Sequence, residues 1–394
     1  MSAPRRLTGG DLLMRRLGVN PPVQLLWRLA GPLDATLVRQ VHAALAQGPL
    51  SRRLAEARLP LARPLWTRSP LAHPPRIDRG PLAPHEVLDW SDTACRTELD
   101  AHGGTGWELA AANVTDGTSV VSLVGSHALT DGQGLLAAVT LAVSGHVSPG
   151  SARASIMDDA LDLLGEGGRT LARLELARLR ARVPRPGAMP ARTGKAALAG
   201  PPVRSRLAVT VAAADLQRVA EAGGGSPTGL ALVMTANILR AARGAAEDPF
   251  VVALPVSFRR PGDLESSNTV GMATVSLDAR SGRHACLAEV RRRCKAAYAS
   301  QGARRHLTGY PTADAALSNA GAVPPETANA FGPSLGVLFR TVSGGGGAPG
   351  RMNCFVLRSG ETVSIGFQSA GVTVGRDLVE AELAAWGITA GHWW

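Results

Sequence analysis

The chain has 394 residues, of which 45% are hydrophobic, and a formal net charge of +11. A chain of this length suits about two domains with substantial cores. No apolar run reaches the roughly 18 residues that a membrane-spanning helix needs, and nucleic-acid binding is disfavoured because only 4% of residues are aromatic and no zinc-finger or RNA-recognition motif occurs.

The first half of the chain alternates strand and helix signals up to about residue 145. Residues 119–125 form an apolar, β-branched run bounded by Asp116 and Gly117, which predicts a buried strand. A helix is predicted to start near Gly134. The run between them, Ser126-His127-Ala128-Leu129-Thr130-Asp131-Gly132, therefore places a histidine at the end of a buried strand and an aspartate four residues later.

This histidine has the properties of a general base. Imidazole titrates near neutral pH, and a rigid strand end can direct His127 into a cleft. Gly132 is expected to allow a tight turn and the close approach of a substrate. A structural interpretation also stands, in which His127 is a satisfied strand-end histidine and Asp131 is the N-cap of the following helix.

Residues 150–204 differ in character from the segments on either side. An acidic apolar stretch is followed by a basic helix over 169–179 and by a Pro/Gly/Ala-rich segment, which indicates a linker or crossover between domains. The basic helix suits either a membrane surface or, as we favour, a solvated position between domains. We thus divide the chain into an N-terminal lobe, a crossover and a C-terminal lobe, at residues 1–149, 150–204 and 205–394.

The second half resumes the alternation of strands and helices. Helices are predicted after Ala214 and over 228–243. The predicted strands are residues 206–211, 250–257, 269–277, 353–357 and 362–367.

The cysteines and the N-terminus bear on location. The four cysteines have no CxxC pairing and no spacing to histidine that suits zinc; they are Cys95, Cys286, Cys294 and Cys354. We expect free thiols in a reducing compartment and no metal site. Residues 4–11 contain arginines and Asp11 and lack the apolar segment of a signal peptide, so a cytoplasmic protein is expected.

The segment from Ser126 to Gly132 resembles the motif of the HxxxD acyltransferase superfamily, which includes chloramphenicol acetyltransferase, peptide-synthetase condensation domains and wax ester synthase/diacylglycerol acyltransferases. The branch of bacterial wax ester synthases and polyketide-associated acyltransferases is the most similar. Other stretches resemble family segments in the same order: Leu7 to Asp11, Gly106 to Leu109, Asp215 to Ala220, Leu254 to Arg260, and Asn268 to Gly271.

The resemblance implies an α/β fold of two chloramphenicol acetyltransferase-like lobes, each a mixed sheet flanked by helices, with a tunnel between them. It implies transfer of an acyl group from acyl-CoA or an acyl carrier protein to an alcohol or amine, in specialised metabolism or lipid ester synthesis. No cofactor is bound, and the phosphopantetheine-linked acyl group is a co-substrate. The basic net charge is compatible with such anionic donors. A monomer is expected, with a possible lipid contact.

The resemblance also assigns roles to residues. His127 is the base, and Asp131 pairs with an arginine, for which Arg259 is expected. Ser126 stands where many relatives have the first of two histidines. Three polar residues are candidates for contacts to the thioester oxygen or the pantetheine arm: Asn268, Ser369 and Gln368.

Two alternatives stay open. The scaffold could catalyse condensation or cyclisation of carrier-bound intermediates, which requires the same residues and a different acceptor. It could also be a non-catalytic homologue that binds a carrier protein, an interpretation that Ser126 keeps open. The joint presence of His127, Asp131, Gly132 and Arg259 argues against the second alternative.

Overall fold

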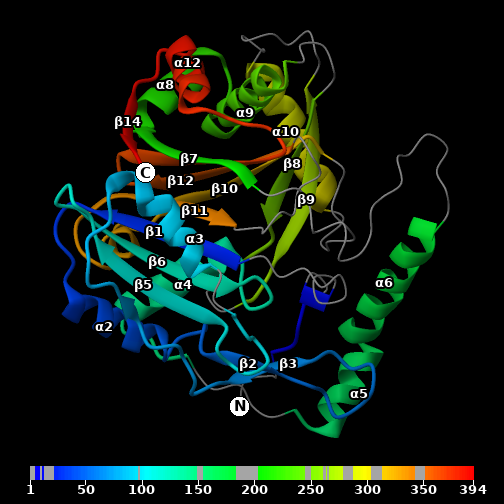
Figure 1. The fold of residues 1–394 in the computed structure, drawn as a ribbon. Helices are drawn as coiled ribbons and strands as arrows, with labels where there is room; N and C mark the ends of the chain where they lie inside the picture. The colour runs from blue at the N-terminus through cyan, green and yellow to red at the C-terminus, as the bar shows by residue number, and fades with distance from the viewer. Residues whose placement is uncertain are drawn as a thin grey trace.

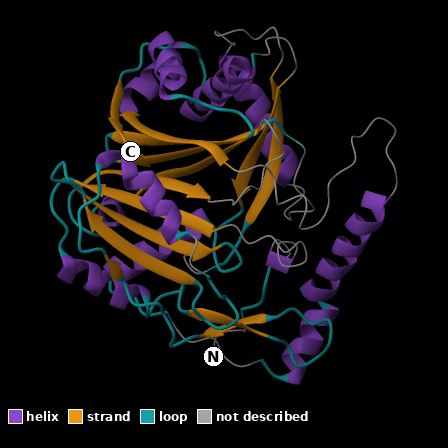
Figure 2. Ribbon diagram, in the orientation of Figure 1, coloured by secondary structure: helices purple, strands orange, loops and turns teal. Residues whose placement is uncertain are grey.

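The computed structural model describes residues 5–8, 11–12, 22–95, 98–148, 154–182, 203–244, 250–260, 263, 266–277, 287–302, 313–341 and 351–394. Within these residues the chain forms two large β-sheets flanked by helices, and a separate two-stranded sheet (Figures 1 and 2). This mixed α/β architecture is the fold class predicted from the sequence.

The first sheet has five strands in the order β11-β1-β6-β5-β4. Its strands are β1 (Pro22–Leu29), β4 (Arg76–Ile77), β5 (Trp107–Asn113), β6 (Ser119–Ser126) and β11 (Ser334–Thr341). Side chains from helices α2 (Ala35–Leu45) and α4 (Gly132–Val143) pack on one face, and α3 (Val87–Ala94), which follows the 3-10 turn η1 (Pro84–Glu86), packs on the other. All eight residues of β6 are buried, because both faces of the sheet are covered.

The second sheet has seven strands in the order β14-β7-β13-β12-β10-β8-β9. They are β7 (Val203–Ala212), β8 (Phe250–Ser257), β9 (Val270–Leu277), β10 (Ala315–Val323), β12 (Arg351–Ser359), β13 (Thr362–Ala370) and β14 (Ala390–Trp393). Four helices contribute to the core on one face: α8 (Ala213–Ala222), α9 (Pro227–Arg243), α10 (Leu287–Gly302) and α12 (Arg376–Ala385).

The remaining elements lie outside the two large sheets. The small sheet pairs β2 (Arg52–Ala55) with β3 (Leu65–Arg68). Helix α5 (Ile156–Leu164) continues into α6 (Glu166–Arg182), which extends away from the two-sheet body in Figure 1, and α11 (Pro325–Ala328) precedes β11. No helix among the described residues is both long and apolar enough to span a membrane.

One strand joins the two halves of the chain. Strand β11 comes from the C-terminal half, yet it pairs antiparallel with β1, with Phe339 opposite Leu25. A boundary at 150–204 therefore does not assign each sheet to one half of the chain. The division into two lobes and a crossover stays a prediction. Residues 150–153 and 183–202 of the predicted crossover lie outside the described residues.

Most predicted elements are present with similar bounds. Strand β8 occupies 250–257 as predicted, and β6, β7, β9, β12 and β13 contain or nearly match their predicted runs. The predicted helices correspond to α4, α6, α8 and α9. These elements have strong local apolar periodicity, which explains why the sequence was sufficient to locate them.

Candidate active site

A compact turn at the end of β6 presents His127. The carbonyl of Ser126 accepts hydrogen bonds from the amides of Leu129 (2.8 Å) and Thr130 (3.1 Å), so the chain folds back at once after the strand. The Ser126 amide donates to the Gly106 carbonyl at 2.8 Å, which keeps this end of β6 paired, and Ser126 itself is buried. His127 is half-buried at the turn, and its Nδ1 is buried without a hydrogen-bond partner.

Asp131 is held by three donors. Its carboxylate accepts from the Gly134 amide (2.7 Å), from the Thr269 amide (3.1 Å) and from Arg259 Nη2 (2.9 Å). The first bond makes Asp131 the N-cap of α4, and the third is the predicted ion pair with Arg259. Because the buried carboxylate is fully engaged, it can fix the position of the turn, and it is poorly placed to accept a substrate proton.

Arg259 connects the segment after β8 to the turn that carries His127. Beyond Asp131, its guanidinium donates to three backbone carbonyls, those of Asp263 (3.2 Å), Ser266 (3.0 Å) and Ser267 (2.9 Å). The arginine thus fixes the loop that leads to Asn268 and, at the same time, the start of α4.

Asn268 contacts the catalytic candidate directly. Its Nδ2 donates to the backbone carbonyl of His127 at 2.5 Å and to Asp11 Oδ1 at 2.7 Å. Its Oδ1 is buried and has no hydrogen-bond partner, and the same holds for the Thr269 hydroxyl. Buried polar groups in folded proteins are nearly always paired, so unpaired ones beside His127 are suited to a water or a bound substrate.

Asp11 belongs to the same cluster and was not predicted as a site residue. Its carboxylate is 2% exposed and accepts from Thr8 N (2.7 Å), Thr8 Oγ1 (2.9 Å), Ser267 Oγ (2.7 Å) and Asn268 Nδ2. All four donors are neutral, and burial raises the pKa of Asp11 above its ordinary value of 3.8. The sequence marked residues 7–11 only as a stretch of family resemblance, and no local pattern ties an aspartate to a loop more than 250 residues away.

The tight turn predicted at Gly132 needs correction, whereas close approach of a substrate there stays a prediction. Gly132 has ordinary helical backbone as the first residue of α4, so the turn does not require glycine there. A Cβ at this position would instead overlap the aromatic ring of Phe339 on β11. Glycine is therefore needed because the start of α4 packs directly on β11.

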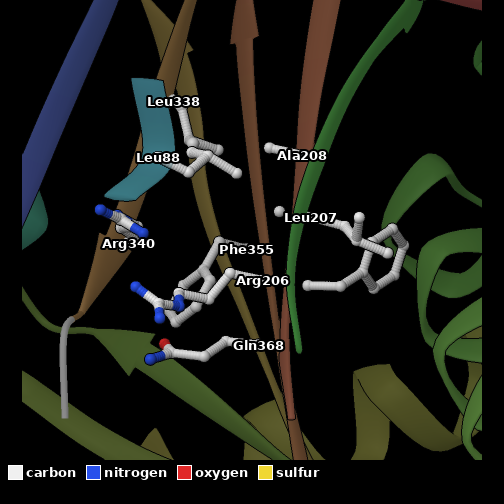
Figure 3. Close-up of a pocket in the computed structure, with 10 residues that line it drawn as sticks. Leu88, Arg206, Leu207, Ala208, Leu338, Arg340, Phe355 and Gln368 are labelled. Carbon is white, nitrogen blue, oxygen red and sulfur yellow. The ribbon is translucent and has the colours of Figure 1, made fainter. Parts of the chain in front are cut away.

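Ser369 and Gln368 lie on β13, away from this cluster of hydrogen bonds. The Ser369 hydroxyl donates to the Val372 carbonyl at 2.8 Å, which is a local contact at the strand end. The Gln368 amide is buried without a partner and lines a pocket with Arg206 of β7 and Arg340 of β11. Figure 3 shows the Arg206 and Gln368 side chains extending toward the side where Arg340 lies.

The described cysteines are unsuited to nucleophilic chemistry. Burial raises the pKa of the Cys95 and Cys354 thiols to about 12 and that of Cys294 to about 11. Their thiolates are scarce at neutral pH. Within the described part of the chain, no group of three or more His, Cys, Asp or Glu side chains is arranged to hold a metal ion.

Comparisons with known proteins bear on the fold. No family model and no curated protein matches the sequence. Among solved structures, the first condensation domain of the CDA synthetase aligns with a TM-score of 0.63 at 17% identity, over 98% of this chain and 94% of that chain. Polyketide synthase associated protein 5 from Mycobacterium tuberculosis aligns with a TM-score of 0.58 at 14% identity, over 98% and 97% of the two chains.

A third structure agrees with these two. The condensation domain of the Monacolin K polyketide synthase MokA has a TM-score of 0.57 at 10% identity, over 98% of this chain and 95% of that chain. The chain thus has the two-lobed, chloramphenicol acetyltransferase-like fold of condensation domains, as predicted.

Proposed function

We propose that the protein is an acyltransferase that moves an acyl group from acyl-CoA or an acyl carrier protein to an alcohol or an amine, with His127 as general base. The observation that carries the proposal is the placement of His127. A half-buried imidazole stands at the end of a fully buried strand, and its backbone carbonyl is held by Asn268. A base fixed in this way can be directed at one bound acceptor.

The chemistry follows from the residue types. His127 removes the proton of the acceptor hydroxyl or amine as that atom attacks the thioester carbonyl. The tetrahedral intermediate then collapses, the carbon–sulfur bond breaks, and the imidazolium returns the proton to the departing thiolate. Such positioned base catalysis contributes about 10²- to 10⁴-fold, and juxtaposition of two bound substrates adds the remainder.

The surrounding residues have supporting roles in this proposal. Asp131, Arg259 and Gly132 position the turn through the ion pair and the packing on Phe339. The unpaired Oδ1 of Asn268, beside His127, is the group we assign to a substrate contact. Gln368 stays a proposed contact for a more distant part of the substrate, since it lies away from His127 on β13. Ser369 loses support as a substrate contact, because its hydroxyl is bonded to Val372.

The same residues suit a second candidate, condensation of carrier-bound substrates. It is favoured by the likeness to condensation domains over almost the whole chain. Here the donor is a phosphopantetheine-linked acyl group on a carrier protein, and the acceptor is an amine or a hydroxyl. Because both sheets and the site come from one chain, we also propose a monomer. A cytoplasmic location, expected from the sequence, stays a proposal.

The test measures free-thiol release from a panel of acyl-CoAs with mixed alcohols and amines. We expect acceptor-dependent release that falls by two or more orders of magnitude in His127→Ala, whereas His85→Ala, which changes an exposed histidine of η1, keeps the wild-type rate. If acyl-CoAs are inert, the assay is repeated with acylated carrier proteins. The proposal fails if neither donor class releases thiol, or if release is indifferent to His127→Ala.

A further inference from the structure

Helix α5 presents its apolar face to solvent and its acidic face to the protein. Asp159 is fully buried and Asp162 is 8% exposed. By contrast, Met157, Leu161 and Leu164 are 68%, 61% and 86% exposed. These three side chains lie at i, i+4 and i+7 and so share one face of the helix. An amphipathic helix of a globular protein normally turns its apolar face toward the core. Helix α5 does the opposite: it buries acidic residues and exposes its apolar face.

Ion pairs and backbone contacts fix this orientation. Asp159 accepts from Arg6 Nη2 (2.5 Å) and from the amides of Arg58 (2.7 Å) and Leu59 (3.0 Å). Asp162 accepts from Arg63 Nη2 at 2.6 Å and from the Arg63 amide at 3.1 Å. Rotating α5 to bury its leucines would break all of these bonds, so its apolar face is held outward by specific contacts.

The loop over residues 58–63, whose amides donate to Asp159 and Asp162 of α5, has a further exposed leucine. Leu61 lies between Leu59 and Arg63, has a φ of 72° and is 73% exposed. Among the described residues it is the only non-glycine residue with a positive φ. A branched side chain in this backbone region is strained, so the loop holds Leu61 outward at a cost in energy. Figure 1 shows this loop, between β2 and β3, reaching α5.

Exposed arginines lie beside this face, and one of them, Arg169, pairs with Glu166 at 3.7 Å. The sequence of α6 contains five arginines and two glutamates over 166–182. Arg169 at its start and Arg58 beside α5 are exposed. Repulsion between such charges, and the net charge of +11, disfavour a second copy of this chain as the occupant. Exposed aliphatic side chains flanked by arginine are typical of helices that lie in the interface of an anionic membrane.

We propose that the outward face of α5, with Ile156, Met157, Leu161 and Leu164, binds the surface of a membrane that contains anionic lipids. A convex helix face can enter the boundary between head groups and acyl chains without a matching groove. Arg169 at the start of α6 and Arg58 add attraction to the anionic head groups. The inference does not depend on the proposed acyl transfer.

The test is flotation of the full chain with vesicles of phosphatidylcholine alone or with added phosphatidylglycerol. We expect binding only to the anionic vesicles, and weaker binding as salt is raised. The double variant Leu161→Ser/Leu164→Ser should lower the partition coefficient by at least about tenfold, because leucine side chains leave the interface. The matched control Leu71→Ser/Leu335→Ser changes two exposed leucines outside α5 and should bind like the wild type.

Four results would overturn the proposal. One is the absence of wild-type binding to either vesicle, and another is binding that depends on salt but is equal in the two double variants. A third is concentration-dependent dimerisation in sedimentation velocity that the α5 substitutions abolish. A fourth is capture of an acidic carrier protein through α5 without vesicle binding, which would assign the surface to a protein partner. Circular dichroism of each variant establishes that the fold is retained.

Discussion

Arg259 and Asp131 form a buried ion pair at 2.9 Å, with side chains 9% and 5% exposed, between the loop after β8 and the first turn of α4. The pair joins a segment that leaves the second sheet to the turn that leaves the first sheet. Because Arg259 also binds three carbonyls of its own loop, a displacement of either segment is transmitted to the other. The geometry around His127 therefore depends on both halves of the chain.

Removing the arginine should destabilise the protein. In Arg259→Ala the Asp131 carboxylate stays buried without its cation, and we expect the free energy of unfolding to fall by about 3 kcal/mol. Arg259→Lys keeps the charge but loses the planar fork, so a smaller loss is expected. Urea unfolding measures both, with the exposed neighbour variant Arg260→Ala as control. Equal free energies of unfolding for Arg259→Ala and wild type would show that the ion pair does not stabilise the fold.

Asp131 should act by position and not by proton transfer. Asp131→Asn keeps the shape of the side chain but loses the charge opposite Arg259, and the resulting shift of the turn should lower kcat/KM by about 10²-fold. The shape of the pH–rate profile should stay that of the wild type, since His127 remains the base. Loss of the acidic limb in Asp131→Asn would instead identify Asp131 as the titrating group.

Asp11 should make stability depend on pH. Burial raises the pKa of Asp11 above 3.8, so the folded state favours the protonated carboxyl more than the unfolded state does. This contribution is fully present below pH 3.8 and is lost as the pH rises through the raised pKa. The unfolding free energy of the wild type should thus decrease relative to that of Asp11→Asn over this window. Chemical unfolding at a series of pH values measures the difference, and parallel curves would contradict the shift.

The same substitution tests the link to His127. In Asp11→Asn an amide nitrogen would face Asn268 Nδ2, and turning the Asn268 amide would place its oxygen against the His127 carbonyl. We expect kcat to fall while the affinity for the thioester donor changes little. Asp11→Ala, which leaves the Asn268 amide free to bind His127, should retain more activity per folded molecule.

Gly132 and Phe339 should be energetically coupled. Gly132→Ala introduces a methyl group that overlaps the Phe339 ring, and we expect a loss of about 1–3 kcal/mol in unfolding free energy. In the double variant Gly132→Ala/Phe339→Leu the smaller side chain should relieve part of this loss. A double-mutant cycle by thermal unfolding gives the coupling energy, and strictly additive effects would exclude the contact.

The sequence located part of the site because some of its signals are local. The strand before His127, the N-cap at Asp131 and the helix after it are all encoded within about thirty residues, where apolar periodicity and capping chemistry act. Arg259 followed from family resemblance, and the ion pair confirms its partner. The tight turn expected at Gly132 was wrong, because the need for glycine comes from packing against Phe339, which folding brings from a distant strand.

The sequence by itself determined the elements: a buried strand ending at His127, strand β8 with its bounds, and the long helix α9 all follow from side-chain patterns that repeat with the period of the local backbone. Only the tertiary structure decided that β11 completes the first sheet, that Asp11 joins Asn268 beside His127, and that α5 turns its leucines outward. Each of these depends on contacts between residues far apart in the chain. Such contacts are determined by the packing and charge balance of the whole molecule, and no short stretch of sequence is sufficient to predict them.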